Sequence, residues 1–372
     1  MNSPTTSCPS ETKQRHTLPM TTFPFPRALL ATLSLSVCIA ASAQQPAPWL
    51  RPDRGIWNVG AGFEFALKES KALKVRRSLS GIACNNNATG ERICLMAFDE
   101  GTQARYATLQ ANQMVPDPQP LFLRPGTAEL DAEAAATDGR YLYVTGSHSA
   151  KRGDCSRNPS SRYVVRLTLD PATGRGLPTS LSHSSRLWDT MTTVPVLKDH
   201  VGERHCLGSE PGQQGINIEG MAVRGERLYF GFRGPVIEGE AWVLSVNAAA
   251  LFGDADTTPE LNRVALGASR GIRDMVAVDG GFLLLAGPDD GKAHRGIPWT
   301  LSWWDGQSSA TLAAVPRHLA TLDLSAVALR ACDTELKPEA ITVLEESAQN
   351  YRVLVLSDGM CDGGPLTFTV PR

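Results

Sequence analysis

The feature that most constrains this chain is a short motif that recurs along it. Each copy has a polar first residue, a short apolar strand, a turn and a second strand rich in aromatic or β-branched residues. The copies begin at Ser80, Glu133, Glu219, Asp274 and Glu339, and the copy at Ser80 is the most degenerate. Two strands joined by an Asp-Gly or other Gly-containing turn are the signature of a β-hairpin. The chain is therefore expected to repeat one hairpin-based unit.

The spacing of the motifs indicates how these units assemble. Most intervals are near the roughly 40–50 residues of one β-propeller blade. The longer interval after Glu133 holds a polar, cysteine-bearing stretch at 151–215, where residues 162–167 predict a further strand pair beside a disulfide-tied loop. We therefore predict an all-β protein, a β-propeller of six blades, with five to seven compatible with the repeats. A β-sandwich would also explain the strands, but not an acidic residue at one point of the repeat.

The first residues have the features of a secretory signal peptide. Arg27 precedes an apolar run at 28–40, and Ala41-Ser42-Ala43 supplies the small residues that a signal peptidase recognises. The run is shorter than the roughly 20 apolar residues of a transmembrane helix. Met20 is an alternative start, because residues 1–19 are polar and lie upstream of the signal.

These features predict the domain organisation and the location of the protein. We expect a signal peptide at 1–43, an N-terminal segment at 44–70 and one propeller domain at 71–372, with the loop insertion near 151–215. After cleavage the protein is predicted to be periplasmic or secreted, without a membrane anchor.

Cysteine usage agrees with export. Two of the 8 cysteines lie in the predicted signal peptide, and the other six form an even set, as expected in an oxidising compartment. Neighbours along the chain are expected to pair, although other connectivities fit the same sequence. The expected pairs are Cys84 with Cys94, Cys155 with Cys206, and Cys332 with Cys361. A zinc–thiolate site is disfavoured because the chain has no C-x-x-C pair.

Composition narrows the partners. The formal net charge of −2 gives no broad positive field for nucleic acid or an anionic membrane. We therefore expect a monomer that binds a small molecule or a protein partner, and no nucleic acid.

The acidic residues of the motif are the candidate functional groups. In a propeller the innermost strands line a central channel, so acids at their starts converge on one mouth. Carboxylates so close together raise one another's pKa or require a cation, and Ca²⁺ accepts six to eight oxygen ligands. The predicted metal ligands are Glu133, Asn217, Glu219, Asp274 and Glu339.

A structural role is the competing interpretation of the same acids. Each acid would then accept hydrogen bonds from the next blade or from an arginine, and would simply lock the ring. Arg233, Arg273 and His148 flank the motif strands. They are predicted either to neutralise the acids or, for His148 and Arg273, to bind a ligand.

Several stretches resemble a bacterial family catalogued as domain of unknown function 3616. They are residues 216–222, 231–235, 271–274, 286–288, 337–340 and 356–358, in the family's order. The resemblance implies a propeller and no established activity. The Glu-Gly-x-Ala element at 219–222 is also similar to one in esterase-like phytase propellers. More distantly it resembles the six-bladed lactonases, in which channel acids hold a divalent ion, but a clear set of Asn and Asp ligands on neighbouring blades is missing here.

Two functional hypotheses follow. In the first, the protein is a calcium-dependent hydrolase of phosphate or carboxylic esters, with Glu219 as general base and Arg233 stabilising the developing anion. In the second, it is a non-catalytic propeller that binds a ligand or protein partner through its loops, including 151–215.

Overall fold

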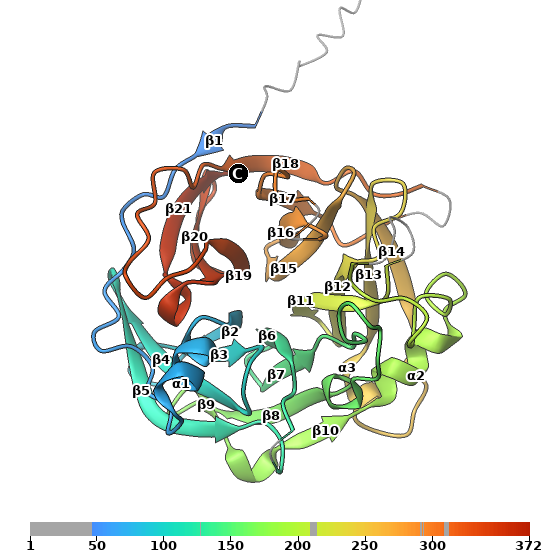
Figure 1. Cartoon of the computed structure of the whole chain (residues 1–372), viewed down its shortest axis with the longest axis horizontal. Helices are drawn as coiled ribbons and strands as arrows, with labels where there is room; N and C mark the ends of the chain where they lie inside the picture. The colour runs from blue at the N-terminus through green and yellow to red at the C-terminus, as the bar shows by residue number, and fades with distance from the viewer. Residues whose placement is uncertain (1–46, 127, 209–213, 291, 293, 309–311) are drawn as a thin grey trace, which may run out of the picture. The chain divides into compact units, whose positions relative to one another are not determined.

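The computed structural model describes residues 47–126, 128–208, 214–290, 292, 294–308 and 312–372. In this part of the chain, five sheets of mostly antiparallel strands surround a central channel, and each sheet is one blade (Figure 1). The prediction of an all-β propeller is confirmed. The predicted signal peptide at 1–43 lies outside the described residues.

The blades are numbered in chain order, and their strands are given from the channel outward. Blade 1 contains β2 (Leu79–Asn86), β3 (Arg92–Phe98), β4 (Gln103–Gln110) and β5 (Gln113–Phe122), and blade 2 contains β6 (Ala132–Thr137), β7 (Tyr141–Gly146), β8 (Val164–Asp170) and β10 (Ser182–Ser184), with β9 (Arg175–Gly176) beside β8. Blade 3 contains β11 (Asn217–Arg224), β12 (Arg227–Gly234), β13 (Glu240–Asn247) and β14 (Glu260–Ala265). Blade 4 contains β15 (Arg270–Val278), β16 (Gly281–Pro288), β17 (Thr300–Trp304), β18 (Arg317–Leu322) and β1 (Trp49–Leu50), and blade 5 contains β19 (Lys337–Glu346), β20 (Asn350–Asp358) and β21 (Leu366–Pro371).

The predicted number of six blades is wrong, because the described chain forms five. Residues 151–215 were expected to add a strand pair, but they instead complete blade 2 with its outer strands β8 and β10. The other described residues of that stretch form the short strand β9, short helical segments and loops. Each motif hairpin is therefore the inner pair of one blade, and the five motifs account for the five blades.

Helices are few and short. The α-helices are α1 (Glu69–Arg76), α2 (Arg186–Thr193) and α3 (Ala248–Leu251), and the 3-10 turns are η1 (Pro159–Ser161), η2 (Pro178–Ser180) and η3 (Cys361–Gly363). None of the helices in the described residues is long and apolar enough to span a membrane.

The N-terminal segment runs along the outside of the ring. Its strand β1 pairs in parallel with β18 of blade 4. The amide of Asp53 then donates to the Thr367 carbonyl of blade 5 over 2.7 Å, and that of Trp57 donates to the Pro365 carbonyl over 2.9 Å. Asn58 next bridges to Gln113 of blade 1. This segment therefore joins three neighbouring blades, including the three-stranded blade 5.

The three predicted disulfides are confirmed. Cys84–Cys94 joins the directly opposed strands β2 and β3, and Cys155–Cys206 ties the long loop of blade 2. Cys332–Cys361 connects the segment before β19 to η3. Such bonds are typical of proteins in oxidising compartments.

Candidate functional site at the charged mouth of the channel

Every inner strand carries an irregularity at the start of the motif. The register of the inner pair shifts between Leu79 and Gly81 in blade 1, and at the equivalent place in the other four blades. A bulge of this kind adds one residue and redirects its side chain. The five bulged residues, here called the bulge ring, are Ser80, Glu133, Glu219, Arg273 and Glu339.

Blade 4 differs from the prediction by one residue. Arg273, not Asp274, stands at the position of Glu219 and Glu339. The Asp274 carboxylate lies one residue deeper and accepts hydrogen bonds from the amides of Met275 over 2.8 Å and Ile341 over 2.7 Å. Asp274 therefore bridges blades 4 and 5 through their backbones, as the structural interpretation of the acids described.

Arg273 connects two acids of the bulge ring. Its Nε lies 2.8 Å from Glu219 Oε2, although the N–H is not aligned with that oxygen, and its Nη2 pairs with Glu339 Oε1. Glu219 Oε1 accepts a hydrogen bond from Arg233 Nη1 over 2.7 Å and from Asn217 Nδ2 over 3.0 Å. Arg273 is only 1% exposed, so this network is a buried cross-link between blades 3, 4 and 5.

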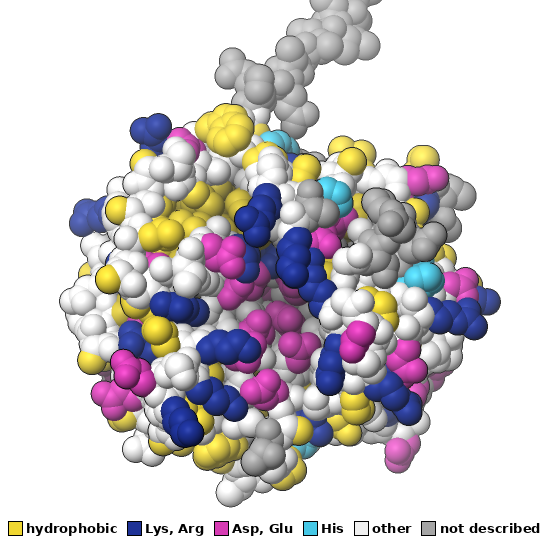
Figure 2. All heavy atoms as spheres, viewed as in Figure 1, with side chains coloured by type: hydrophobic (Ala, Val, Ile, Leu, Met, Phe, Trp, Pro, Cys, Tyr) yellow, Lys and Arg dark blue, Asp and Glu magenta, His cyan; other side chains and the backbone are white. Residues whose placement is uncertain are grey.

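The second strands contribute another set of side chains to this mouth. In each second strand this is the residue after the one that pairs with the pre-bulge residue. Four blades supply a side chain at this position, namely Asp99, Ser147, Arg233 and Asp358, and blade 4 has Gly287 there. Figure 2 shows Asp and Glu side chains gathered in the central hollow of this face, with Lys and Arg at its margin. This end of the channel is called the charged mouth.

Burial raises the pKa of three acids at the charged mouth and so favours their protonated forms. It raises the pKa of Glu339 to about 7, against the opposing effect of the Arg273 charge. It raises the pKa of Asp131 to about 6, although the Ser147 hydroxyl donates to that carboxylate. Burial also holds the pKa of Asp99 well above its usual range, with Asp358 adding to the shift.

Glu133 is the exceptional acid of the bulge ring. It is partly exposed, and its side chain makes no hydrogen bond or ion pair with any residue that the structure describes. Burial, followed by the charges of Glu219 and Asp131, raises its pKa well above the usual range. Glu133 is thus a carboxyl group that favours its protonated form and remains accessible from the mouth.

Strained backbone flanks Glu133. Asp131 precedes β6 with a φ of 57°, and His148 follows β7 with a φ of 53°. A positive φ costs energy for residues other than glycine and often marks a functional site. His148 is fully buried, neither ring nitrogen has a partner among the described residues, and burial lowers its pKa to about 3. Its predicted ligand-binding role stays a prediction.

The residues proposed to bind calcium do not form a common cage. The guanidinium of Arg273 lies between Glu219 and Glu339, and Asp274 is bonded to backbone amides. In the described chain, only Cys332, Asp333 and Cys361 bring three donor atoms within 4.8 Å of one another, and the two cysteines form a disulfide. These residues therefore fit a divalent metal ion poorly, because the positively charged guanidinium of Arg273 already lies between Glu219 and Glu339.

Comparisons with known proteins identify the family of the chain. No curated protein matches the chain. Among solved structures, the native Bacillus subtilis arabinanase is 8% identical to this chain, with a TM-score of 0.41. The match covers 79% of this chain and 94% of the arabinanase. A GH43 β-1,3-galactosidase with bound galactodeoxynojirimycin is 9% identical, with a TM-score of 0.45 and coverages of 86% and 94%. The α-L-arabinofuranosidase of Lactobacillus brevis is 10% identical, with a TM-score of 0.42 and coverages of 80% and 91%.

These likenesses are too distant to inform the chemistry of the charged mouth. The family comparison is more specific, since it spans residues 73–169 and 179–362 and so includes the whole bulge ring. The chain belongs to the family described as protein of unknown function, DUF3616.

Proposed function

We propose that this protein is an exported hydrolase of phosphate or carboxylic esters, with its active site at the charged mouth. The observation that carries this proposal is the accessible Glu133 carboxyl group, which lacks a partner in the described residues and has a raised pKa. A carboxyl group whose pKa is raised in this way holds its proton more firmly and can donate it to a leaving group.

The neighbouring groups support complementary roles. Asp131, with a pKa of about 6, is mostly ionised at neutral pH and can accept a proton from the attacking water. The attacking water forms the new bond to carbon or phosphorus and gives its proton to Asp131. The bond from that carbon or phosphorus to the leaving oxygen breaks, and the leaving oxygen takes the proton of Glu133. Arg233 then stabilises negative charge on the reacting group.

Glu219 receives a different role from the one that the sequence suggested. Both of its oxygens face arginines, and it is only 3% exposed. We assign it to positioning Arg233 and Arg273 rather than to general-base catalysis. No step in this mechanism requires a metal ion.

The experiment compares hydrolysis of phenyl acetate and phenyl phosphate, whose unactivated leaving groups depend on protonation, by the wild type and by Glu133→Gln. The variant keeps the shape of the side chain but cannot donate the proton, so kcat is expected to fall by roughly 10²-fold or more. The control is Glu226→Gln, an exposed acid in the turn between β11 and β12.

The pH dependence of the activity tests the role of Asp131 as the proton acceptor. The kcat/KM of the wild type should rise with pH through about 6 as Asp131 ionises. The proposal fails if the wild type cleaves neither ester, or if Glu133→Gln and Glu226→Gln are equally active.

A further inference from the structure

A second group of reactive side chains lies beside the charged mouth, at the turn that leads into the inner strand of blade 4. Residues 267–271 of this turn read Gly-Ala-Ser-Arg-Gly, which is a G-x-S-x-G pattern. In hydrolases this pattern forms a nucleophile elbow, a sharp turn that presents a serine hydroxyl. The elbow usually joins a strand to a helix, whereas here it joins β14 to β15. The serine is reactive only if it also has a base, so its contacts decide its role.

The backbone of the turn is as sharp as the pattern indicates. Ser269 has a φ of 57° and Gly267 a φ of 98°. A side chain at Gly271 would collide with the carbonyl of Arg233, so only glycine fits there. A positive φ costs energy at a serine and persists where the surroundings impose it. Ser269 is partly exposed, so this strained residue is in contact with solvent.

Ser269 is the first member of a serine–histidine–aspartate chain. Its Oγ lies 3.4 Å from His294 Nε2, and His294 Nδ1 lies 2.5 Å from Asp289 Oδ1. A carboxylate can only accept, so Nδ1 carries the proton of the neutral imidazole and Nε2 is the acceptor. This tautomer can take the proton of a serine nucleophile. The serine–histidine distance suits a site without substrate, where catalytic hydrogen bonds are often long.

The aspartate is buried and held from two sides. Asp289 Oδ1 also accepts from the amide of Asp290 over 2.7 Å, and Oδ2 accepts from Gln214 Nε2 over 3.0 Å. Asp289 is only 2% exposed, whereas the side chain of His294 is 26% exposed. The acid is therefore fixed, and the imidazole between the acid and the serine remains accessible.

The backbone holds the three residues in register. The amide of Asp289 donates to the Ser269 carbonyl over 3.0 Å. Arg270 Nη2 donates to the Pro298 carbonyl over 3.2 Å, in the loop that also carries His294. These bonds join the turn, the end of β16 and the loop before β17. The arrangement of the three side chains is thus supported by the scaffold around them.

We propose that Ser269, His294 and Asp289 form a second catalytic site, which hydrolyses carboxylic esters through an acyl-enzyme. Ser269 Oγ attacks the ester carbonyl carbon while His294 Nε2 takes the hydroxyl proton. The bond from that carbon to the leaving oxygen breaks, and the leaving alcohol takes the proton from His294. Asp289 is a positioning residue that orients the imidazole.

Water completes the reaction. It attacks the acyl carbon and gives a proton to His294 Nε2. The bond from that carbon to Ser269 Oγ then breaks, Oγ regains the proton, and the carboxylic acid leaves. This site is independent of the hydrolase proposed at Glu133, because the mechanism proposed there forms no covalent intermediate.

The test is covalent labelling of the full mature chain with phenylmethylsulfonyl fluoride, from which an activated serine displaces fluoride. Mass spectrometry should find one sulfonyl group, and peptide mapping should place it on Ser269. Ser269→Gly removes the hydroxyl and suits a φ of 57°, so it should fold and stay unlabelled. The control is Ser325→Ala, at an exposed serine whose hydroxyl donates to Asp323 over 2.6 Å, and it should be labelled at the wild-type rate.

Two further variants test the partners of the serine. His294→Gln removes the base and should slow the labelling of Ser269 by about 10²-fold or more. Asp289→Asn should slow it by a similar factor, because the imidazole loses the carboxylate that sets its tautomer. A purely structural role of Asp289 would leave the labelling rate of a folded variant unchanged. Thermal melts establish that each variant is folded.

Acetylation distinguishes this site from the one proposed at Glu133. After reaction with p-nitrophenyl acetate and an acid quench, an acetyl group should be found on Ser269 in the wild type and equally in Glu133→Gln. The proposal is overturned if the wild type carries no sulfonyl group on Ser269, or if a folded His294→Gln is labelled as fast as the wild type. Mapping of the wild type decides the matter even if a variant fails to fold.

Discussion

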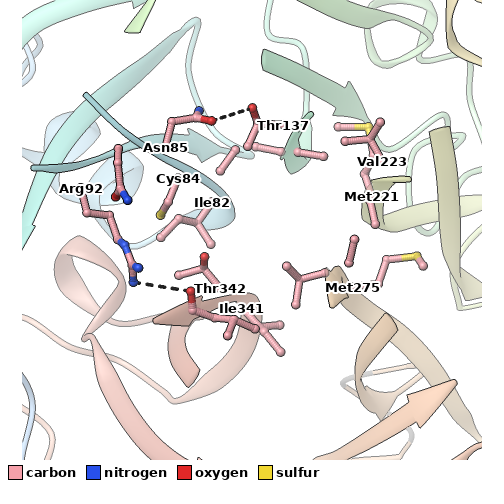
Figure 3. Close-up of a pocket in the computed structure, with 18 residues that line it drawn as sticks. Ile82, Cys84, Asn85, Arg92, Thr137, Met221, Val223, Met275, Ile341 and Thr342 are labelled. Carbon is pink, nitrogen blue, oxygen red and sulfur yellow. Dashed lines mark hydrogen bonds between the residues drawn. The ribbon is translucent and has the colours of Figure 1, made fainter. Parts of the chain in front are cut away.

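The two mouths of the channel are built from the same five strands, yet they differ in almost every chemical respect. At the charged mouth the bulges direct Glu133, Glu219, Arg273 and Glu339 toward the axis. A few residues later, at the opposite end of the channel, the same strands line a cavity of about 400 Å³ with uncharged residues such as Ala136, Ala277 and Thr342 (Figure 3). Regular strand geometry thus produces a neutral cavity, and one extra residue in each strand concentrates ionisable groups at the other end.

The largest expected effect on stability comes from Asp274, the residue directly after the bulge of β15, which lies between the two ends of the channel. Asp274→Ala removes the acceptor of two buried amides and should destabilise the protein by about 4 kcal/mol, lowering the urea midpoint strongly. The exposed Asp279, in the turn of the same hairpin, is the matched control, and Asp279→Ala should cost less than about 0.5 kcal/mol. Equal urea midpoints for the two variants would show that the hydrogen bonds of Asp274 do not stabilise the fold.

Removing the positive charge of Arg273 at the charged mouth should have the next largest effect on stability. Arg273→Met leaves Glu219 and Glu339 buried without their shared partner and should cost about 3 kcal/mol at pH 8. The loss should be smaller at pH 5, where protonation removes the unpaired charge. Arg317→Met, at an exposed position of blade 4, serves as the control. A loss independent of pH would contradict this account.

The acids of the charged mouth should make stability depend on pH. The pKa of Glu339 is raised from 4.5 to about 7, so the folded protein binds more protons than the unfolded chain between these values. The contribution of Glu339 is therefore present at low pH and is lost as the pH rises toward 7, by about 2 kcal/mol. Chemical denaturation at pH 4.5 and 7.5 should show this fall in the wild type and a smaller one in Glu339→Gln. A steeper fall in the variant would contradict the prediction.

The smallest expected effect is that of a chelator. Because Arg273 already lies between Glu219 and Glu339, we expect EDTA to shift the melting temperature by less than about 1 °C. Melts with EDTA and with added CaCl₂ measure this directly. A rise in melting temperature of several degrees with CaCl₂ would contradict this expectation and would support the calcium ion that the sequence predicted.

The sequence predicted the hairpins, the three disulfides and the propeller because these depend on local patterns. It overestimated the number of blades, because residues 151–215 are long enough to form a further blade but instead complete blade 2. Helices α1 and α2 were not predicted. Helix α1 has eight residues, of which only Val75 is buried, and α2 is also only eight residues long, so neither shows a convincing apolar period.

The charged mouth was predicted only in part. The bulge that places Arg273, rather than Asp274, in the ring is a one-residue shift that a repeat alignment cannot detect. Asp99 and Asp358 were missed as site residues, although Asp99 directly follows β3 and Asp358 is the last residue of β20. Comparing that position across the five copies would have identified them.

The segment that runs along the outside of the ring has a consequence for the order of assembly. Residues 49–58 are synthesised before every blade, but their partners Leu322 and Thr367 lie near the end of the chain. Contacts between such distant residues form slowly, because a very long loop must close first. The earliest part of the described chain therefore finds its place last, and the circle stays open until the final strands are complete.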